Sequence, residues 1–222
     1  MAISRRLFLQ VSAFSVLQTA MLVSAQEVKS DKRILVYGDS NSFGYGYDAK
    51  AGIFRLPIEK VWPQVMAKDL GNNYSVTVNA LSGRTICRNQ NDGSGTGKTM
   101  RAEDFNGMES LRGTLSGNFP LDLVIVMLGT NDSNSSHKAS GQELAEDLAK
   151  MALLIKEAGW QSKTPYSAPK VLLIAPPVQP NDTAYGGAFN GAEKITRDLA
   201  PALKEKAKEI GVEYLNAQDF LK

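Results

Sequence analysis

Short apolar runs alternate along the chain with longer segments in which apolar residues recur every three or four positions. The short runs predict buried β-strands at Ile34–Tyr37, Tyr74–Ala80, Leu121–Leu128, Lys170–Ala175 and Val212–Leu215. The recurring positions predict helices over residues 57–70, 142–158 and 191–210, and a short helix near Met108–Leu115. Near-continuous apolar strands separated by amphipathic helices indicate an α/β fold whose parallel sheet is covered on both faces.

The first and last long helices carry start and stop signals. Pro57 suits the first turn of a helix, and Gly71 is expected to end that helix. The predicted inward face of the helix consists of Val61, Val65, Met66 and Leu70. In the last helix, Pro201 predicts a kink and Gly211 predicts a C-terminal cap.

Three of the predicted strands end in polar segments that contain glycine. These segments are Gly38-Asp39-Ser40, Leu81-Ser82-Gly83 and Gly129-Thr130-Asn131-Asp132. The carboxyl ends of parallel strands lie at one edge of a sheet, and ligands bind at that edge in folds of this kind. We therefore expect the three segments to meet and to form the functional site.

The residue types in these segments suit acyl chemistry. A serine in a strand-to-helix turn lies near a helix N-terminus, which favours a nucleophile facing developing negative charge. Ser40 is the candidate nucleophile, and the Gly83 N–H and the Asn131 amide are candidate donors to a tetrahedral intermediate. The same residue types are common in ordinary turns, so the pattern alone also fits a purely structural role.

These segments, in this order and at these strand ends, resemble three of the four sequence blocks of the SGNH (GDSL-type) hydrolase family. The resemblance covers roughly residues 33–218 and is closest to the arylesterase/acyltransferase branch, through residues 120–125, 127–132 and 168–172. It implies a flavodoxin-like three-layer α/β/α sandwich with a five-stranded parallel sheet. It also implies serine esterase chemistry that needs no metal and no other cofactor.

The family resemblance assigns roles to individual residues. Ser40 becomes the nucleophile, and its own N–H, the Gly83 N–H and the Asn131 side chain become the oxyanion hole. The remaining motif positions, which are expected to be mainly structural, are Gly38, Asp39, Gly129, Thr130 and Asp132. Phe43 and Tyr45 follow the nucleophile closely, and they either line a substrate pocket or pack over the first helix.

The fourth block of the family, Asp-x-x-His, has no match in the 222 residues, and no histidine follows His137. This block supplies the general base for the serine and the carboxylate that orients it. We expect the sequence to be incomplete at its C-terminal end, because the last helix of the family fold is missing too. The alternative is a protein without the usual base. His137 is a candidate substitute base, although an ordinary loop histidine is the simpler interpretation.

Residues 1–25 have the features of an export signal. Arg5 and Arg6 precede a mostly apolar run that ends in Val23-Ser24-Ala25, and this segment resembles the twin-arginine signal of bacteria. The predicted organisation is a signal peptide over 1–25, a flexible lead-in over 26–32 and a hydrolase-like domain over 33–222. We expect the twin-arginine export machinery as a partner, a periplasmic or secreted location and no stable membrane span after cleavage. An uncleaved membrane anchor is the alternative.

Charge and composition exclude several classes of function. Without the two arginines of the first 25 residues, 23 basic and 23 acidic groups remain, so no basic patch suggests nucleic-acid binding. One cysteine and one histidine exclude a Cys-rich zinc site and a multi-histidine metal site.

Two hypotheses follow from the sequence. The first is a serine esterase that hydrolyses small aryl or acetyl esters through an acyl-enzyme on Ser40, with acyl transfer to alcohols as a variant. The alternative is a non-catalytic ester- or glycan-binding protein that lacks the Asp-x-x-His base. In both cases the partner is a small molecule, and the oligomeric state stays open.

Overall fold

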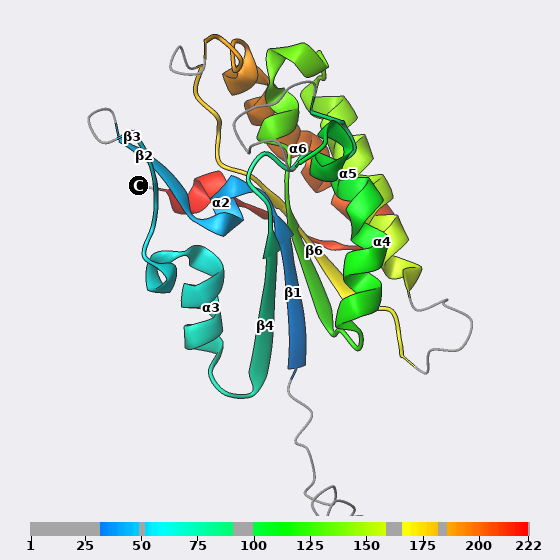
Figure 1. Ribbon diagram of the computed structural model, residues 1–222. Helices are drawn as coiled ribbons and strands as arrows, with labels where there is room; N and C mark the ends of the chain where they lie inside the picture. Colours follow the sequence, from blue (N-terminus) through cyan, green and yellow to red (C-terminus); the bar gives the residue numbers. More distant parts are fainter. Residues whose placement is uncertain (1–31, 49–51, 91–99, 159–165, 182–185, 222) are drawn as a thin grey trace, which may run out of the picture. The chain divides into compact units, whose positions relative to one another are not determined.

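A five-stranded parallel sheet forms the centre of the fold (Figure 1). The computed structural model describes residues 32–48, 52–90, 100–158, 166–181 and 186–221, and the predicted export signal lies outside them. The strands are β1 (Lys32–Gly38), β4 (Tyr74–Ala80), β5 (Leu123–Met127), β6 (Lys170–Ala175) and β7 (Glu213–Asn216). Their order is β4-β1-β5-β6-β7, which is the flavodoxin-like order. Lys32, predicted to be part of the lead-in, is instead the first residue of β1.

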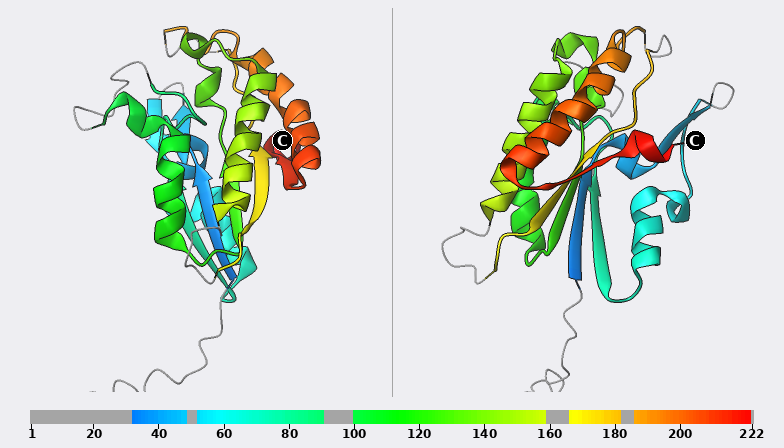
Figure 2. Two further views of the ribbon diagram at one scale, coloured as in Figure 1. Left: turned by 90° about the vertical axis from the view of Figure 1, so that its right-hand side faces the viewer. Right: turned by 180° about the vertical axis from the view of Figure 1, so that it is seen from behind.

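Helices cover both faces of this sheet, as the two views of Figure 2 show. The helices are α3 (Trp62–Leu70) on one face and α4 (Gly107–Asn118), α5 (Gly141–Lys156) and α6 (Ala192–Ile210) on the other. Successive side chains of a strand point to opposite faces. Accordingly Leu35 and Tyr37 of β1 pack with α4, α5 and α6, whereas Ile34 and Val36 pack on the face of α3. The predicted three-layer α/β/α architecture is confirmed.

The predicted helix over residues 57–70 is wrong in its start and in part of its inward face, since Val61 is buried and Met66 packs against the sheet as predicted. Residues Ile58–Lys60 form a separate 3₁₀ turn, Val61 is extended, and α3 begins at Trp62 with Pro63 in its first turn. This break shifts the helical phase. Trp62 and Met66, four residues apart, therefore face the sheet. Two members of the predicted stripe, Val65 and Leu70, are exposed.

A β-hairpin absent from the sequence prediction follows the first strand. The helix α2 (Ser40–Phe43) leads into β2 (Tyr45–Asp48), which pairs antiparallel with β3 (Gly52–Arg55). The helix α4 is also longer than expected and begins after Asn106, whose side chain accepts hydrogen bonds from the N–H groups of Met108 and Glu109. Only Gly44 separates the hairpin from α2.

Candidate active site

Ser40 is the first residue of the one-turn helix α2, directly beyond the carboxyl end of β1. The Asp39 carboxylate caps this helix by accepting a hydrogen bond from the Asn41 N–H at 2.9 Å. The Ser40 N–H donates to no group among the described residues. The chain turns tightly here, because a Cβ on Gly38 would lie 2.2 Å from the Ser42 Oγ. Glycine at this position therefore allows β1 to run directly into the serine-bearing helix.

Gly83 lies in the turn after β4, and its backbone is left-handed with φ +84°. Its carbonyl accepts a hydrogen bond from the Gln90 side chain at 2.7 Å. Like that of Ser40, its N–H donates to no group in the described part of the chain. A Cβ at Gly83 would lie 3.1 Å from the Phe105 ring, so both conformation and space favour glycine.

Asn131 follows β5 and is tied to the other two segments. Its Nδ2 donates to the Arg84 carbonyl at 2.9 Å, which leaves the second amide N–H without an acceptor among the described residues. The neighbouring Thr130 accepts a hydrogen bond from Asn41 Nδ2 at 3.0 Å. The three predicted strand-end segments are thus joined by hydrogen bonds at one edge of the sheet.

Asp132 anchors the segment after β4 from within the core. Its two carboxylate oxygens each lie 3.0 Å from the Ile86 nitrogen, and Arg88 donates to one of them at 3.1 Å. Arg88 also pairs with Asp147 of α5 at 3.0 Å. Burial raises the pKa of Asp132 to about 6, although the Ile86 N–H and Arg88 both favour its ionised form. These contacts tie the segment after β4 to the segment after β5.

Arg84 is a site component that the sequence analysis missed. Its side chain is buried with 5% of its surface exposed, and its guanidinium carbon lies 4.1 Å from the centroid of the Tyr37 ring. The guanidinium donates to the Gly38 carbonyl at 3.0 Å and to the Asn79 carbonyl and side chain at 2.7 and 2.8 Å. These hydrogen bonds join the carboxyl ends of β1 and β4, two residues before Ser40 in the chain. The only sequence signal for this residue is its position next to Gly83.

Asp39 is the acidic neighbour of Arg84. Burial raises the pKa of its carboxyl group to about 7, while the Asn41 N–H and the charge of Arg84 act in the opposite direction. One of its oxygens, Oδ2, is buried and has no partner among the described residues. Burial in turn lowers the pKa of the Arg84 guanidinium. The N-cap of the serine helix is therefore a titratable group.

His137 is not joined to Ser40. It ends a 3₁₀ turn, Ser135–His137, and no hydrogen bond or ion pair links its side chain to any described residue. Burial and the charge of Arg88 lower its pKa, so the imidazole is neutral at pH 7. No carboxylate hydrogen-bonds to the ring within the described ranges to orient it, as a catalytic base would require.

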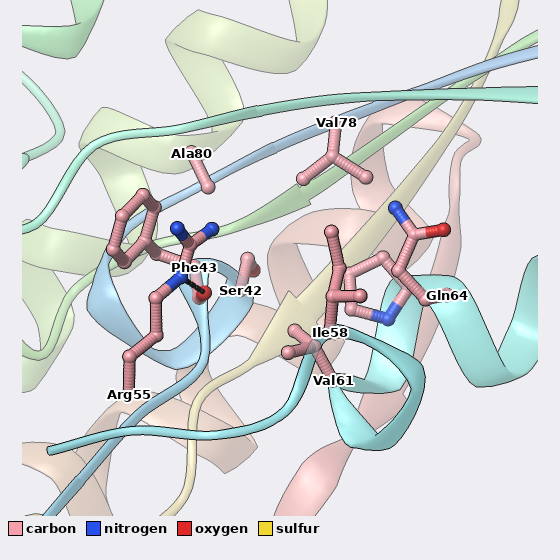
Figure 3. A pocket seen from close by; sticks show the side chains of 9 residues that line it. Ser42, Phe43, Arg55, Ile58, Val61, Gln64, Val78 and Ala80 are labelled. Carbon is pink, nitrogen blue, oxygen red and sulfur yellow. Dashed lines mark hydrogen bonds between the residues drawn. The ribbon is translucent and has the colours of Figure 1, made fainter.

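Phe43 and Tyr45 have different environments. Their ring centroids are 5.4 Å apart, and Tyr45 is 42% exposed. Phe43 lines a pocket of about 230 Å³ (Figure 3). The other walls of the pocket come from β3, the 3₁₀ turn Ile58–Lys60, α3 and β4. Tyr45 is not among the residues that line it.

The part of the chain that the structure describes contains no group of three or more His, Cys, Asp or Glu side chains arranged to hold a metal ion. Within the same residues, no helix has the length and apolar character needed to span a bilayer.

The profile of the GDSL-like lipase/acylhydrolase family matches residues 36–222. The chain belongs to this family, and the class that its fold and family define is that of carboxylic ester hydrolases.

Several characterised proteins are similar to it. A carbohydrate acetylesterase from Sinorhizobium meliloti is 32% identical, with 85% of each chain covered and a TM-score of 0.73. An aryl esterase from Mycobacterium smegmatis is 30% identical, with the same coverage and TM-score. An acetylxylan esterase from Xylanibacter ruminicola is 26% identical over 195 residues. The match covers 83% of this chain but 35% of that protein, so the chain spans about a third of that relative.

Proposed function

We propose that this protein is a serine esterase that hydrolyses small aryl or acetyl esters. The observation that carries the proposal is the set of donors around Ser40. The N–H groups of Ser40 and Gly83 have no acceptor in the described chain, and the Asn131 amide is held by the Arg84 carbonyl with one N–H to spare. Preorganised donors of this kind stabilise an oxyanion, and the loss of one costs about 10²–10³ in kcat.

In the proposed reaction, the Ser40 Oγ bonds to the ester carbonyl carbon and gives its proton to a base. The carbonyl oxygen becomes an oxyanion between the three donors. When the carbonyl re-forms, the C–O bond to the alcohol breaks, the alcohol leaves with that proton, and the acyl group stays on Ser40. Water then adds to the acyl carbon and gives a proton to the base, the bond between this carbon and Ser40 Oγ breaks, and Oγ regains the proton as the acid leaves. An alcohol in place of water gives acyl transfer.

A serine esterase needs a general base for Ser40, whereas a non-catalytic binding protein does not. His137 is the only histidine in the sequence, and it forms no hydrogen bond with Ser40. This observation favours, as second candidate, an ester- or glycan-binding protein that retains the donors without turnover. The relatives support the choice of ester. Two of them are described as acting on acetylated carbohydrates and one on aryl esters.

The test is hydrolysis of 4-nitrophenyl acetate by the full 222-residue chain. We expect turnover that Ser40→Ala lowers by at least a thousandfold, because the nucleophile is lost. Ser167→Ala, a serine-to-alanine change at an exposed loop position, serves as the matched control and should retain full activity. Turnover unaffected by Ser40→Ala contradicts the serine mechanism. If the folded chain has no turnover, the esterase proposal fails for these 222 residues, and binding of an ester without its hydrolysis would support the second candidate.

The variant His137→Ala then identifies the base. A loss of turnover equal to that of Ser40→Ala would assign the base to His137, brought to Ser40 by a movement of its turn. Unchanged turnover would exclude His137 from this role.

We also propose export through the twin-arginine pathway to the periplasm or beyond, since Arg5 and Arg6 precede an apolar run. Replacement of both arginines by lysine should retain the protein in the cytoplasmic fraction of a bacterial host. Equal export of both forms would contradict the proposal.

A further inference from the structure

The pocket beside α2 combines apolar walls with one cation. Its apolar lining comes from four elements and includes Phe43, Ile58, Val61, Pro63, Val78 and Ala80. The polar lining consists of Arg55, Gln64 and Ser42, so the pocket has a guanidinium but no acidic side chain in its wall. Figure 3 shows Arg55 and Phe43 side by side at one end of the pocket and Gln64 at the other.

Arg55 stacks on the Phe43 ring. Its guanidinium carbon lies 3.7 Å from the centroid of that ring, and its Nε lies 3.4 Å from the Phe43 carbonyl oxygen. No Asp or Glu whose side chain the structure describes forms an ion pair with Arg55. An arginine stacked on an aromatic ring has a fixed orientation and a weakly hydrated charge, which suits it for recognising a carboxylate.

The pocket is also close to the proposed nucleophile in the chain. Phe43 follows Ser40 by three residues in the same single turn of helix, and positions three apart lie on one side of a helix. Phe43 therefore lies on the same side of α2 as Ser40, and it also forms part of the pocket wall. The volume of about 230 Å³ is below the range of roughly 300–1,000 Å³ for drug-sized ligands, so it suits a single ring or a short chain.

We infer that this pocket is a subsite for a small apolar group that bears a carboxylate, with Arg55 as the anion-binding residue. This inference rests on the proposed esterase function, because it adds that esters carrying such a group are preferred substrates. The apolar walls would bind the ring or chain, and the Arg55 guanidinium would bind the carboxylate as a charge-assisted pair.

The first experiment measures binding alone, with benzoate as the probe and benzamide as its neutral isostere. NMR titrations of the full chain give the two affinities. We expect benzoate to bind roughly fivefold more tightly, which is the size of a solvent-exposed ion pair, and we expect added salt to reduce the preference.

Variants assign the preference to Arg55. Arg55→Gln should abolish it, whereas Arg112→Gln, the same change at an exposed position of α4, should retain it. Equal affinities in the parent protein, or an unchanged preference in Arg55→Gln, overturn the inference.

The second experiment compares kcat/KM for 4-carboxyphenyl acetate and phenyl acetate. The ratio should exceed one in the parent protein and fall in Arg55→Gln by roughly the factor seen for binding. Ser40-dependent hydrolysis of phenyl acetate with no preference for benzoate overturns the subsite but not the esterase. A benzoate preference that depends on Arg55, without hydrolysis of phenyl acetate, overturns the esterase but not the binding site.

Discussion

Replacement of Arg84 by methionine tests whether this buried cation holds the site together. Methionine is also unbranched, but it is shorter than arginine and has no charge and no N–H donors. The change removes the hydrogen bonds to Gly38 and Asn79 and the contact with the Tyr37 ring. Three hydrogen bonds at about 1 kcal/mol each give a loss of about 3 kcal/mol.

Relief of the cost of burying a charge offsets part of that loss. Burial lowers the pKa of Arg84, which means that the folded protein disfavours the guanidinium cation at this position. We therefore expect Arg84→Met to lower the free energy of unfolding by roughly 1–3 kcal/mol. Arg84→Lys should lose nearly as much, because an ammonium group cannot span the three acceptors that the planar fork reaches.

Urea unfolding followed by circular dichroism measures the loss, with Arg112→Met as the control at an exposed position. The control should change stability by less than about 0.5 kcal/mol. The site should respond as well, because the Arg84 carbonyl holds the Asn131 amide. In 4-nitrophenyl acetate hydrolysis, kcat should fall more than KM rises. An Arg84→Met protein as stable and as active as the parent would refute the reasoning.

Two further predictions concern the residues around Ser40. Burial raises the pKa of Asp39 from 3.8 to about 7, so its ionisation costs stability as pH rises through that interval. Asp39→Asn keeps the acceptor for the Asn41 N–H and should gain stability relative to the parent between pH 4 and pH 8, by at most roughly 4 kcal/mol. Urea unfolding of both proteins across this pH range measures the difference in their free energies of unfolding. A difference that does not change with pH contradicts the assigned pKa. Gly83→Ala forces alanine to φ +84° and brings a Cβ to 3.1 Å from Phe105. It should cost about 1–2 kcal/mol of stability, because alanine disfavours a positive φ, and it should lower kcat by displacing the Gly83 N–H. An alanine protein with parental stability would contradict the strain assigned to this position.

Local sequence pattern determined the layers and the edge at which the site lies. Apolar runs are long enough to identify the five strands, and a parallel sheet directs all their carboxyl ends to one edge. For this reason Ser40, Gly83 and Asn131 could be grouped before their contacts were known. Helix α6 likewise ends at the predicted cap, a left-handed Gly211, with Leu199 and Leu203 buried and with Pro201 inside the helix.

Only the tertiary structure decided which groups support that site. Arg84 reaches Gly38 across 46 residues of sequence, and Asp132 reaches Ile86 across the same separation. A buried arginine and an exposed one look alike in a sequence, since the difference lies in partners that the fold supplies. The β2–β3 hairpin and the later start of α3 were missed because short strands and an extended residue such as Val61 leave little periodic signal. The pocket that Phe43 and Arg55 line depends on the hairpin and on the position of α3. A cavity forms between elements of the fold, so the sequence of one element does not reveal it.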